Sequence, residues 1–291
     1  MPDMDGLEFI RVLRETPDRG SVPILMITAN DQKQLRYRAL DLGANDFLTK
    51  PVDKVEFLAR TRNMLQVSDA RKQLADRASW LADEVRKATA QIVARERETV
   101  FHLCKAAEYR DPETGAHILR MAHYSQLIAR GLGLSVDDQE LLLEAAPMHD
   151  IGKVGIADKI LLKPGRLDAE EFEVMKQHAI YGYELLHGSS SRVLQAGAEI
   201  ARGHHEKFDG SGYPGGVTGT DIPIFSRIVA VADVFDALTS VRPYKKAWTL
   251  EAAVDFLVQG SGSHFDPQCV QAFLTAWDDV MEIRGRYQEE V

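Results

Sequence analysis

The sequence has few cysteines, no long apolar run and no basic leader. Its two cysteines, Cys104 and Cys269, form no CxxC pair and suggest no disulfide framework, which fits a reducing compartment. No apolar run approaches the roughly 20 residues that cross a bilayer. The first residues, Met1-Pro2-Asp3, do not resemble a signal peptide. We therefore expect a cytoplasmic protein.

The sequence also has no excess of basic over acidic residues. The 35 lysines and arginines face 44 aspartates and glutamates, which leaves a net charge of −9. This balance argues against binding a nucleic-acid polymer or an anionic membrane, but it allows a small anionic substrate in a local basic or metal-lined pocket. The 291 residues, 45% hydrophobic and 27% charged, are typical of a soluble globular protein with one or two domains.

Residues 1–66 alternate between helical and strand patterns. The apolar run 23–28 predicts a buried parallel strand, and 47–48 predicts a second short one. Helices are predicted around them at 7–14, at 31–42, where Gly43 ends the helix, and from an Asp53 cap to residue 65. Two strands cannot form a stable doubly wound sheet, so this region looks like half of an α/β domain.

Residues 67–98 are polar, helix-prone and free of proline and glycine. Apolar residues recur in a heptad-like seam. The pattern predicts a dimeric signalling helix, and the alternative is a single helix packed on a domain. The seam consists of Leu74, Ala78, Leu81, Val85, Ala88 and Ile92.

From residue 99 onward every segment has a helical pattern. Capping residues set the expected starts, among them Asp168 with Glu171 in a capping box and Asp266 followed by proline. The helices are expected at 111–130, 137–146, 168–187, 190–203 and 222–238, from 249 and from 266.

Two adjacent histidines, His204 and His205, end one of these helices. Neighbouring helix positions point about 100° apart, so two rings that converge on one object need a wide object, such as a metal cluster. The alternative is a chance pair at a surface turn.

Further metal-ligating side chains are spread over the same helical region. Glu113 and His117 are four residues apart and share a helix face. Asp233 lies in an apolar helix, where an unpaired carboxylate would be costly. Each residue alone could be structural, but together they suit two or three divalent ions such as iron or manganese. The full set is Glu113, His117, His149, Asp150, His178, His204, His205 and Asp233.

The N-terminal region resembles the C-terminal half of a response-regulator receiver domain. The resemblance lies in MPDMDG at 1–6, the strand that ends at Ala29, GANDF at 43–47, and Lys50-Pro51. In that family the phosphorylated aspartate precedes the Met-Pro with which this sequence starts. Thr28 and Lys50 match the family's switch residues.

Residues 99–280 closely resemble the HD-GYP family of cyclic di-GMP phosphodiesterases. The motifs are HDIGKVGI at 149–156, ILLKPGRL at 160–167, MKQH at 175–178, HHEKFDGSGYP at 204–214, IPIFSRIVAVADVFDALTS at 222–240, RPYK at 242–245 and HFDP at 264–267. The family's ligand positions fall on the eight residues named above. Because Glu113 is present, the sequence resembles those family members that are expected to bind three metal ions. Ala157 replaces a usual proline but lies outside the metal set.

This resemblance implies a mainly α protein. An all-helical HD-type metal-dependent hydrolase domain at 99–291 follows a helical, coiled-coil linker at 67–98 and a truncated receiver at 1–66. The implied reaction is hydrolysis of cyclic di-GMP to pGpG and on to GMP in bacterial second-messenger signalling. The implied assembly is a homodimer through 67–98, with signalling proteins as further partners.

The residue chemistry agrees with a phosphodiesterase. A pair of ions lowers the pKa of a bound water and stabilises both oxygens of an in-line displacement, and Asp150 is the natural bridging ligand. We expect Lys153 to contact the phosphate and stabilise the leaving group, and Arg242 and Lys245 to clamp the phosphates.

The glycine-rich turn supplies two further candidates. Tyr213 is expected to contact guanine or ribose, or to anchor the turn. Asp209 is placed beside the substrate but is better suited to holding the loop.

Two other functions remain open from sequence. A catalytically weak receptor would bind cyclic di-GMP and act through protein contacts. An HD phosphohydrolase acting on another nucleotide is permitted by the His149-Asp150 pair alone, although the GYP and RPYK motifs argue against it.

Overall fold

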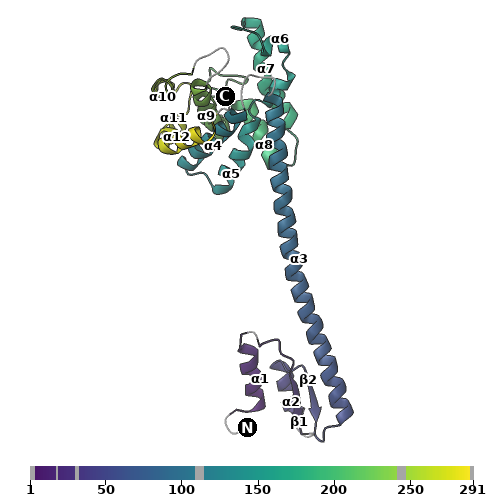
Figure 1. Ribbon diagram of the computed structural model, residues 1–291. Helices are drawn as coiled ribbons and strands as arrows, with labels where there is room; N and C mark the ends of the chain where they lie inside the picture. Colours follow the sequence, from purple (N-terminus) through teal and green to yellow (C-terminus); the bar gives the residue numbers. More distant parts are fainter. Residues whose placement is uncertain (1–3, 18, 30–32, 109–114, 241–246, 289–291) are drawn as a thin grey trace. The chain divides into compact units, whose positions relative to one another are not determined.

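The computed structural model describes residues 4–17, 19–29, 33–108, 115–240 and 247–288 (Figure 1). The chain forms two compact units, residues 1–92 and 93–291. None of the helices within the described ranges combines the length and the apolarity that a bilayer crossing needs.

The first unit is a small α/β arrangement around a parallel strand pair. It contains α1 (Gly6–Glu15), β1 (Leu25–Thr28), α2 (Lys33–Asp41) and β2 (Asp46–Thr49). Leu25 pairs with Asp46 and Thr28 with Thr49. The expected elements are therefore present. Their small core consists of Leu7, Ile10, Ala39 and Ala44.

The expectation of a fully buried strand at 23–28 is wrong. The strand is shorter, and Ile27 in its middle is 42% exposed. Successive strand residues face opposite sides of a sheet, and Met26 packs on the core with the helices. Ile27 therefore lies on the other side, which the described residues of this unit do not cover.

One continuous helix, α3 (Lys54–Glu108), replaces the separate receiver helix and linker helix that the sequence analysis expected. It begins at the predicted cap, where the Asp53 carboxylate accepts from the Glu56 amide at 2.8 Å. No glycine or proline interrupts its 55 residues, so nothing local ends the helix near residue 66. The larger seam residues, Leu74, Leu81, Val85 and Ile92, are 47% to 69% exposed.

The regular secondary structure of the second unit is helical in its described residues, apart from one isolated β-bridge (Figure 1). After the end of α3 come α4 (Gly115–Gly131), α5 (Val136–Ala145), η1 (Ala146–Met148), η2 (Ile151–Gly155), α6 (Asp158–Leu161), α7 (Ala169–Leu186), α8 (Arg192–Gly203), η3 (Gly219–Asp221), α9 (Ile224–Thr239), α10 (Leu250–Gln259), α11 (Pro267–Thr275) and α12 (Trp277–Arg286).

The core of this unit lies where α4, α9 and α11 meet. Tyr124, Phe235 and Phe273 are fully buried there, with ring centroids 4.8 to 5.8 Å apart. Edge-on contacts of this kind add to the burial of their apolar area. Apolar packing thus fixes α4 and α9, which carry His117 and Asp233.

Side-chain caps mark the starts of several helices. Asp168 and Glu171 form the predicted reciprocal capping box of α7. Asp266 caps α11, with Pro267 at its first position, as predicted. Two details differ from expectation: Ser135 caps α5, which starts at Val136, and α11 ends at Thr275 before a separate α12. The start of the helix expected from residue 111 lies outside the described residues.

Candidate metal centre

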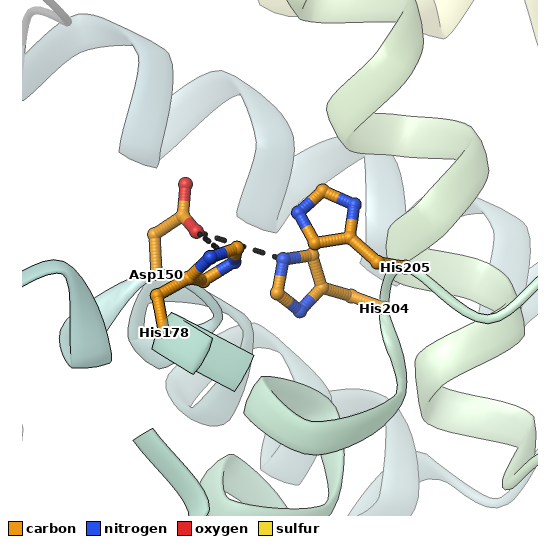
Figure 2. Close-up of side chains that lie close together, drawn as sticks. All are labelled: Asp150, His178, His204 and His205. Carbon is orange, nitrogen blue, oxygen red and sulfur yellow. Dashed lines mark ion pairs between the residues drawn. The ribbon is translucent and has the colours of Figure 1, made fainter. Parts of the chain in front are cut away.

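Seven of the predicted ligands converge in the second unit. Asp150, His178, His204 and His205 form one group, shown in Figure 2, and each offers a ligand atom within 4.8 Å of the others. A second group, equally compact, consists of His117, His149 and Asp233. Glu113, Arg242 and Lys245 lie outside the described residues.

Several short segments of the second unit bring these side chains together. His149 and Asp150 lie between η1 and η2, His178 is on α7, and the histidine pair follows α8. Gly152 lets η2 press against α7, because a Cβ at this position would lie 1.9 Å from the carbonyl oxygen of His178. Only glycine allows so close an approach.

The histidine pair does not diverge as two helical positions would. Helix α8 ends at Gly203 and His204 is its C-cap, so the pair is not bound to helical spacing. The ring centroids of His204 and His205 lie 4.0 Å apart, and both rings belong to the group in Figure 2. The pair therefore lies among the other predicted ligands, as a shared metal site requires.

Backbone carbonyls set the orientation of three histidines. In His149, His178 and His204, Nδ1 lies 3.2, 2.7 and 3.1 Å from the carbonyl oxygen three residues earlier. A carbonyl can only accept, so Nδ1 carries the proton and the neutral ring keeps a lone pair on Nε2. This is the arrangement that metal-ligating histidines adopt.

Asp150 lies where the two groups meet. Its Oδ1 is 3.2 Å from Nε2 of His178 and 3.6 Å from Nε2 of His204. Its Oδ2 faces the other way, 3.3 Å from Nε2 of His149 and 2.9 Å from Nζ of Lys153. The two oxygens thus face different histidines, as a bridging carboxylate requires.

The second group continues from His149. Oδ1 of Asp233 lies 3.9 Å from Nε2 of His149 and 3.7 Å from Nε2 of His117. His149 therefore links the two carboxylates, and the two groups form one continuous cluster rather than two separate sites.

The ionisation states suit metal binding. Burial alone would raise the pKa of Asp150, but Lys153 and His149 outweigh it and hold that pKa well below its usual value. Burial lowers the pKa of His178 and brings the pKa of His205 well below its usual value. The carboxylate therefore stays charged and these two rings stay neutral, which are the forms that bind metal.

The donor set fits divalent cations. Nε2 of His178, Nε2 of His204 and Oδ1 of Asp150 are buried and accept no hydrogen bond from any described group. A buried acceptor without a hydrogen-bond donor destabilises the fold unless a bound cation takes the donor's place. A mixed set of imidazole nitrogens and carboxylate oxygens suits iron, manganese or zinc.

The residues that hold His117 were not predicted from the sequence. Asp236 is 1% exposed, and its Oδ2 accepts from Nδ1 of His117 at 2.8 Å. Arg120 binds both oxygens of Asp236, at 2.6 and 2.8 Å. Burial would raise the pKa of Asp236, but the hydrogen bonds from His117 and Arg120 lower it. The signal was in the spacing, since Asp236 follows Asp233 by three residues and Arg120 follows His117 by three.

The glycine-rich loop after the histidine pair is held by its own acidic residues. Glu206, which was not predicted from the sequence either, is buried and accepts from the amides of Gly215 at 2.6 Å and Val217 at 3.1 Å. Asp209 is exposed and accepts from the amide of Ser211 at 2.8 Å, which shapes the turn. The loop places the Tyr213 ring centroid 4.7 Å from that of His205.

Comparisons with known proteins agree with this picture. A model of the HD domain matches residues 71–269, and a model of the response regulator receiver domain matches residues 1–62. The "Cyclic di-GMP phosphodiesterase response regulator RpfG" of Xanthomonas campestris is 47% identical over 287 residues, which cover 99% of this chain and 76% of the relative.

Two further relatives match different shares of this chain. A "Cyclic di-GMP phosphodiesterase" of Thermotoga maritima is 37% identical, with 100% of this chain and 80% of the relative covered. The "3'3'-cGAMP-specific phosphodiesterase 2" of Vibrio cholerae is 47% identical over 65% of this chain and 36% of the relative. The chain belongs to the HD domain family, among the phosphodiesterases that carry a response regulator receiver region. The resemblance and the mainly α fold class inferred from the motifs are confirmed.

Proposed function

We propose that this protein hydrolyses cyclic di-GMP to pGpG and on to GMP, as part of bacterial second-messenger signalling. The observation that carries the proposal is the convergence of buried imidazole Nε2 atoms on Asp150, with Nδ1 of three rings facing backbone carbonyls. The cyclic di-GMP phosphodiesterases matched along this chain support the choice of substrate.

The cofactors we propose are two or three divalent ions, iron or manganese. When bound, such ions lower the pKa of a water and polarise the phosphate oxygens. Glu113 is the residue that a third ion would need. The proposed ligands are Glu113, His117, His149, Asp150, His178, His204, His205 and Asp233.

Lys153 is the proposed proton donor and phosphate contact. Its ammonium is largely buried and lies 2.9 Å from Oδ2 of Asp150, so it is held beside the metal ligands. From there it can donate a hydrogen bond to a phosphate oxygen and to the oxygen that leaves. Arg242 and Lys245 are proposed to clamp the phosphates from the RPYK segment, and Tyr213 to contact the guanine or ribose. Asp209 serves the same substrate pocket by shaping the loop.

Metal analysis and turnover test this function together. Protein purified without oxygen and loaded with iron or manganese should contain at least two ions per chain and should convert cyclic di-GMP to pGpG. Asp150→Ala should remove both metal and activity. Active protein with one ion or none would contradict the proposal.

A second candidate substrate is 3'3'-cGAMP. The motivating observation is the 47% identity, over 65% of this chain, to a phosphodiesterase named as specific for this dinucleotide. Competition between the two cyclic dinucleotides, followed by product analysis, distinguishes the candidates through their kcat/KM ratio. A single-turnover measurement separates an enzyme from a weakly catalytic receptor that acts on protein partners.

We further propose a cytoplasmic homodimer with a receiver region at 1–66, a linker at 67–98 and the catalytic domain at 99–291. The exposed seam residues of α3 support pairing of this helix with a second copy. Pairing would pass a signal from the receiver region or from another signalling protein to the catalytic domain.

A further inference from the structure

An aromatic side chain beside the metal centre has no part in the chemistry described so far. Phe172, in the first turn of α7, is 46% exposed. Its ring centroid lies 6.1 Å from that of Tyr213, and the two ring planes are nearly perpendicular, at 83°. Tyr213 in turn contacts His205. The two rings therefore form a corner that begins at the metal-ligating histidines and reaches the surface.

Lys176 joins the two rings. It lies one helical turn after Phe172, with its ammonium 5.5 Å from the centroid of that ring and 5.8 Å from the centroid of Tyr213. A cation at these distances is attracted to both ring faces. Lys176 also pairs with the exposed Glu173 at 2.6 Å, a contact of the kind that contributes little. The lysine thus links α7 to the glycine-rich loop through the two rings.

Exposure alone would not set Phe172 apart. Val174 and Leu185 on the same helix are exposed as well, and single exposed apolar side chains are common. Phe172 differs because it shares a cation with a ring that contacts a candidate metal ligand. The shared cation holds the two rings together, and they present an aromatic surface beside His205.

We propose that Phe172 and Tyr213 form a stacking platform for one nucleobase of the substrate, with Lys176 as the residue that positions the two rings. The inference rests on the proposed function, since a cyclic dinucleotide brings its bases close to the phosphodiester bond that the metal centre attacks. Base stacking on aromatic side chains is a general means of holding nucleotides and depends little on which base is bound. The platform therefore contributes affinity and does not choose between guanine and adenine.

The test is steady-state hydrolysis by the full chain loaded with manganese, on cyclic di-GMP and on 3'3'-cGAMP. Phe172→Ala should raise KM about tenfold for both substrates while kcat stays within about twofold, because the lost contact holds ground state and transition state alike. Phe172→Trp should keep the original KM. Val174→Ala, on the same exposed helix, is the matched control and should behave as wild type.

The positioning role of Lys176 has its own variants. Lys176→Met should raise KM in the same way. Lys176→Arg should keep the wild-type KM, because a guanidinium keeps the attraction to both rings. Metal content should be unchanged in all these variants. Methyl p-nitrophenyl phosphate, a diester without a base, should be cleaved equally well by wild type and by each variant.

Three results would overturn the platform: an unchanged KM in Phe172→Ala, a joint loss of metal and kcat, or failure of tryptophan to preserve KM. Failure of the proposed function looks different, because wild type would then cleave the small diester but neither cyclic dinucleotide. In that case equilibrium binding of the two cyclic dinucleotides decides, and equal affinities of wild type and Phe172→Ala would refute the platform.

Discussion

Asp236 holds His117 by a hydrogen bond of 2.8 Å from Nδ1 of the imidazole to Oδ2 of the carboxylate. The carboxylate is itself fixed by two hydrogen bonds from Arg120. Arg120 also donates to the carbonyl oxygen of Tyr287 at 2.9 Å, so the end of the described chain is tied to the same network. His117 thus differs from the three histidines held by backbone carbonyls, because its ring is oriented by side chains that a mutation can remove.

The first prediction concerns this network. Asp236→Ala should weaken metal binding about 10- to 100-fold, because His117 loses the partner that sets its tautomer and ring orientation. Metal titration of the apoprotein measures the effect. Asp255→Ala, an exposed aspartate on α10, serves as the control and should bind metal as wild type does. Equal affinities of the two variants would show that Asp236 only supports the fold.

The second prediction separates metal binding from turnover. Lys153→Ala should keep its ions, because the lysine contacts Asp150 without being a ligand, but kcat should fall by roughly 100-fold or more through loss of a proton donor. Metal content and kcat are measured on the same preparation. Arg242→Ala should likewise retain metal and lose activity. If either variant loses its ions, the residue belongs to the ligand network instead.

The third prediction concerns the close approach of η2 and α7. Gly152→Ala places a Cβ 1.9 Å from the carbonyl oxygen of His178, so the two segments must separate. The free energy of unfolding should fall by about 1–3 kcal/mol, and metal content should fall with it. Gly285→Ala is the control, because no atom lies within 4 Å of its Cβ and α12 gains helix propensity. Urea unfolding that gives equal midpoints for both variants would contradict the packing argument.

The side chains that converge were predicted from the sequence more fully than the residues that hold them in place. His178 and Asp233 could be found because a capping box defines one helix and a carboxylate interrupts an apolar run in the other. Asp236 carries the same signal as Asp233, but sequence does not tell which of the two carboxylates joins the group of candidate ligands and which holds His117 from behind. That distinction depends on Arg120, which is brought to Asp236 by the packing of α4 on α9.

The fold was predictable where the signals are local. The caps at Asp53, Asp168 and Asp266 marked the starts of α3, α7 and α11, whereas the continuity of α3 was missed because a break was expected at the end of the receiver region. The burial of β1 could not be deduced from its apolar run, because the exposure of Ile27 depends on which elements cover the sheet.

The fourth prediction concerns thiol reactivity. Cys104 and Cys269 are both buried, and burial, with Asp266 nearby, raises the pKa of Cys269 to about 12. The thiolate is the reactive form, so at pH 8 almost none is present at Cys269 in the folded protein. Iodoacetamide should leave Cys269 unmodified in native protein and alkylate it in urea, as measured by peptide mass spectrometry. Rapid native labelling would show that this core opens.

The last prediction concerns the seam of α3. An exposed row of apolar residues on a long helix is costly in water unless a second helix covers it, and this row repeats every seven residues as a coiled coil requires. Leu81→Asp should therefore convert a dimer to a monomer, because the charge would be buried between the two helices. Ser79→Asp places the same charge on an exposed position of the same helix away from the seam, and it should leave the dimer intact.

Sedimentation velocity over a range of concentrations distinguishes the two states. A wild-type monomer, or an equal loss of dimer in both variants, would mean that pairing does not use this seam. If the Leu81→Asp monomer also hydrolyses cyclic di-GMP at the wild-type rate, pairing of α3 does not control the catalytic domain.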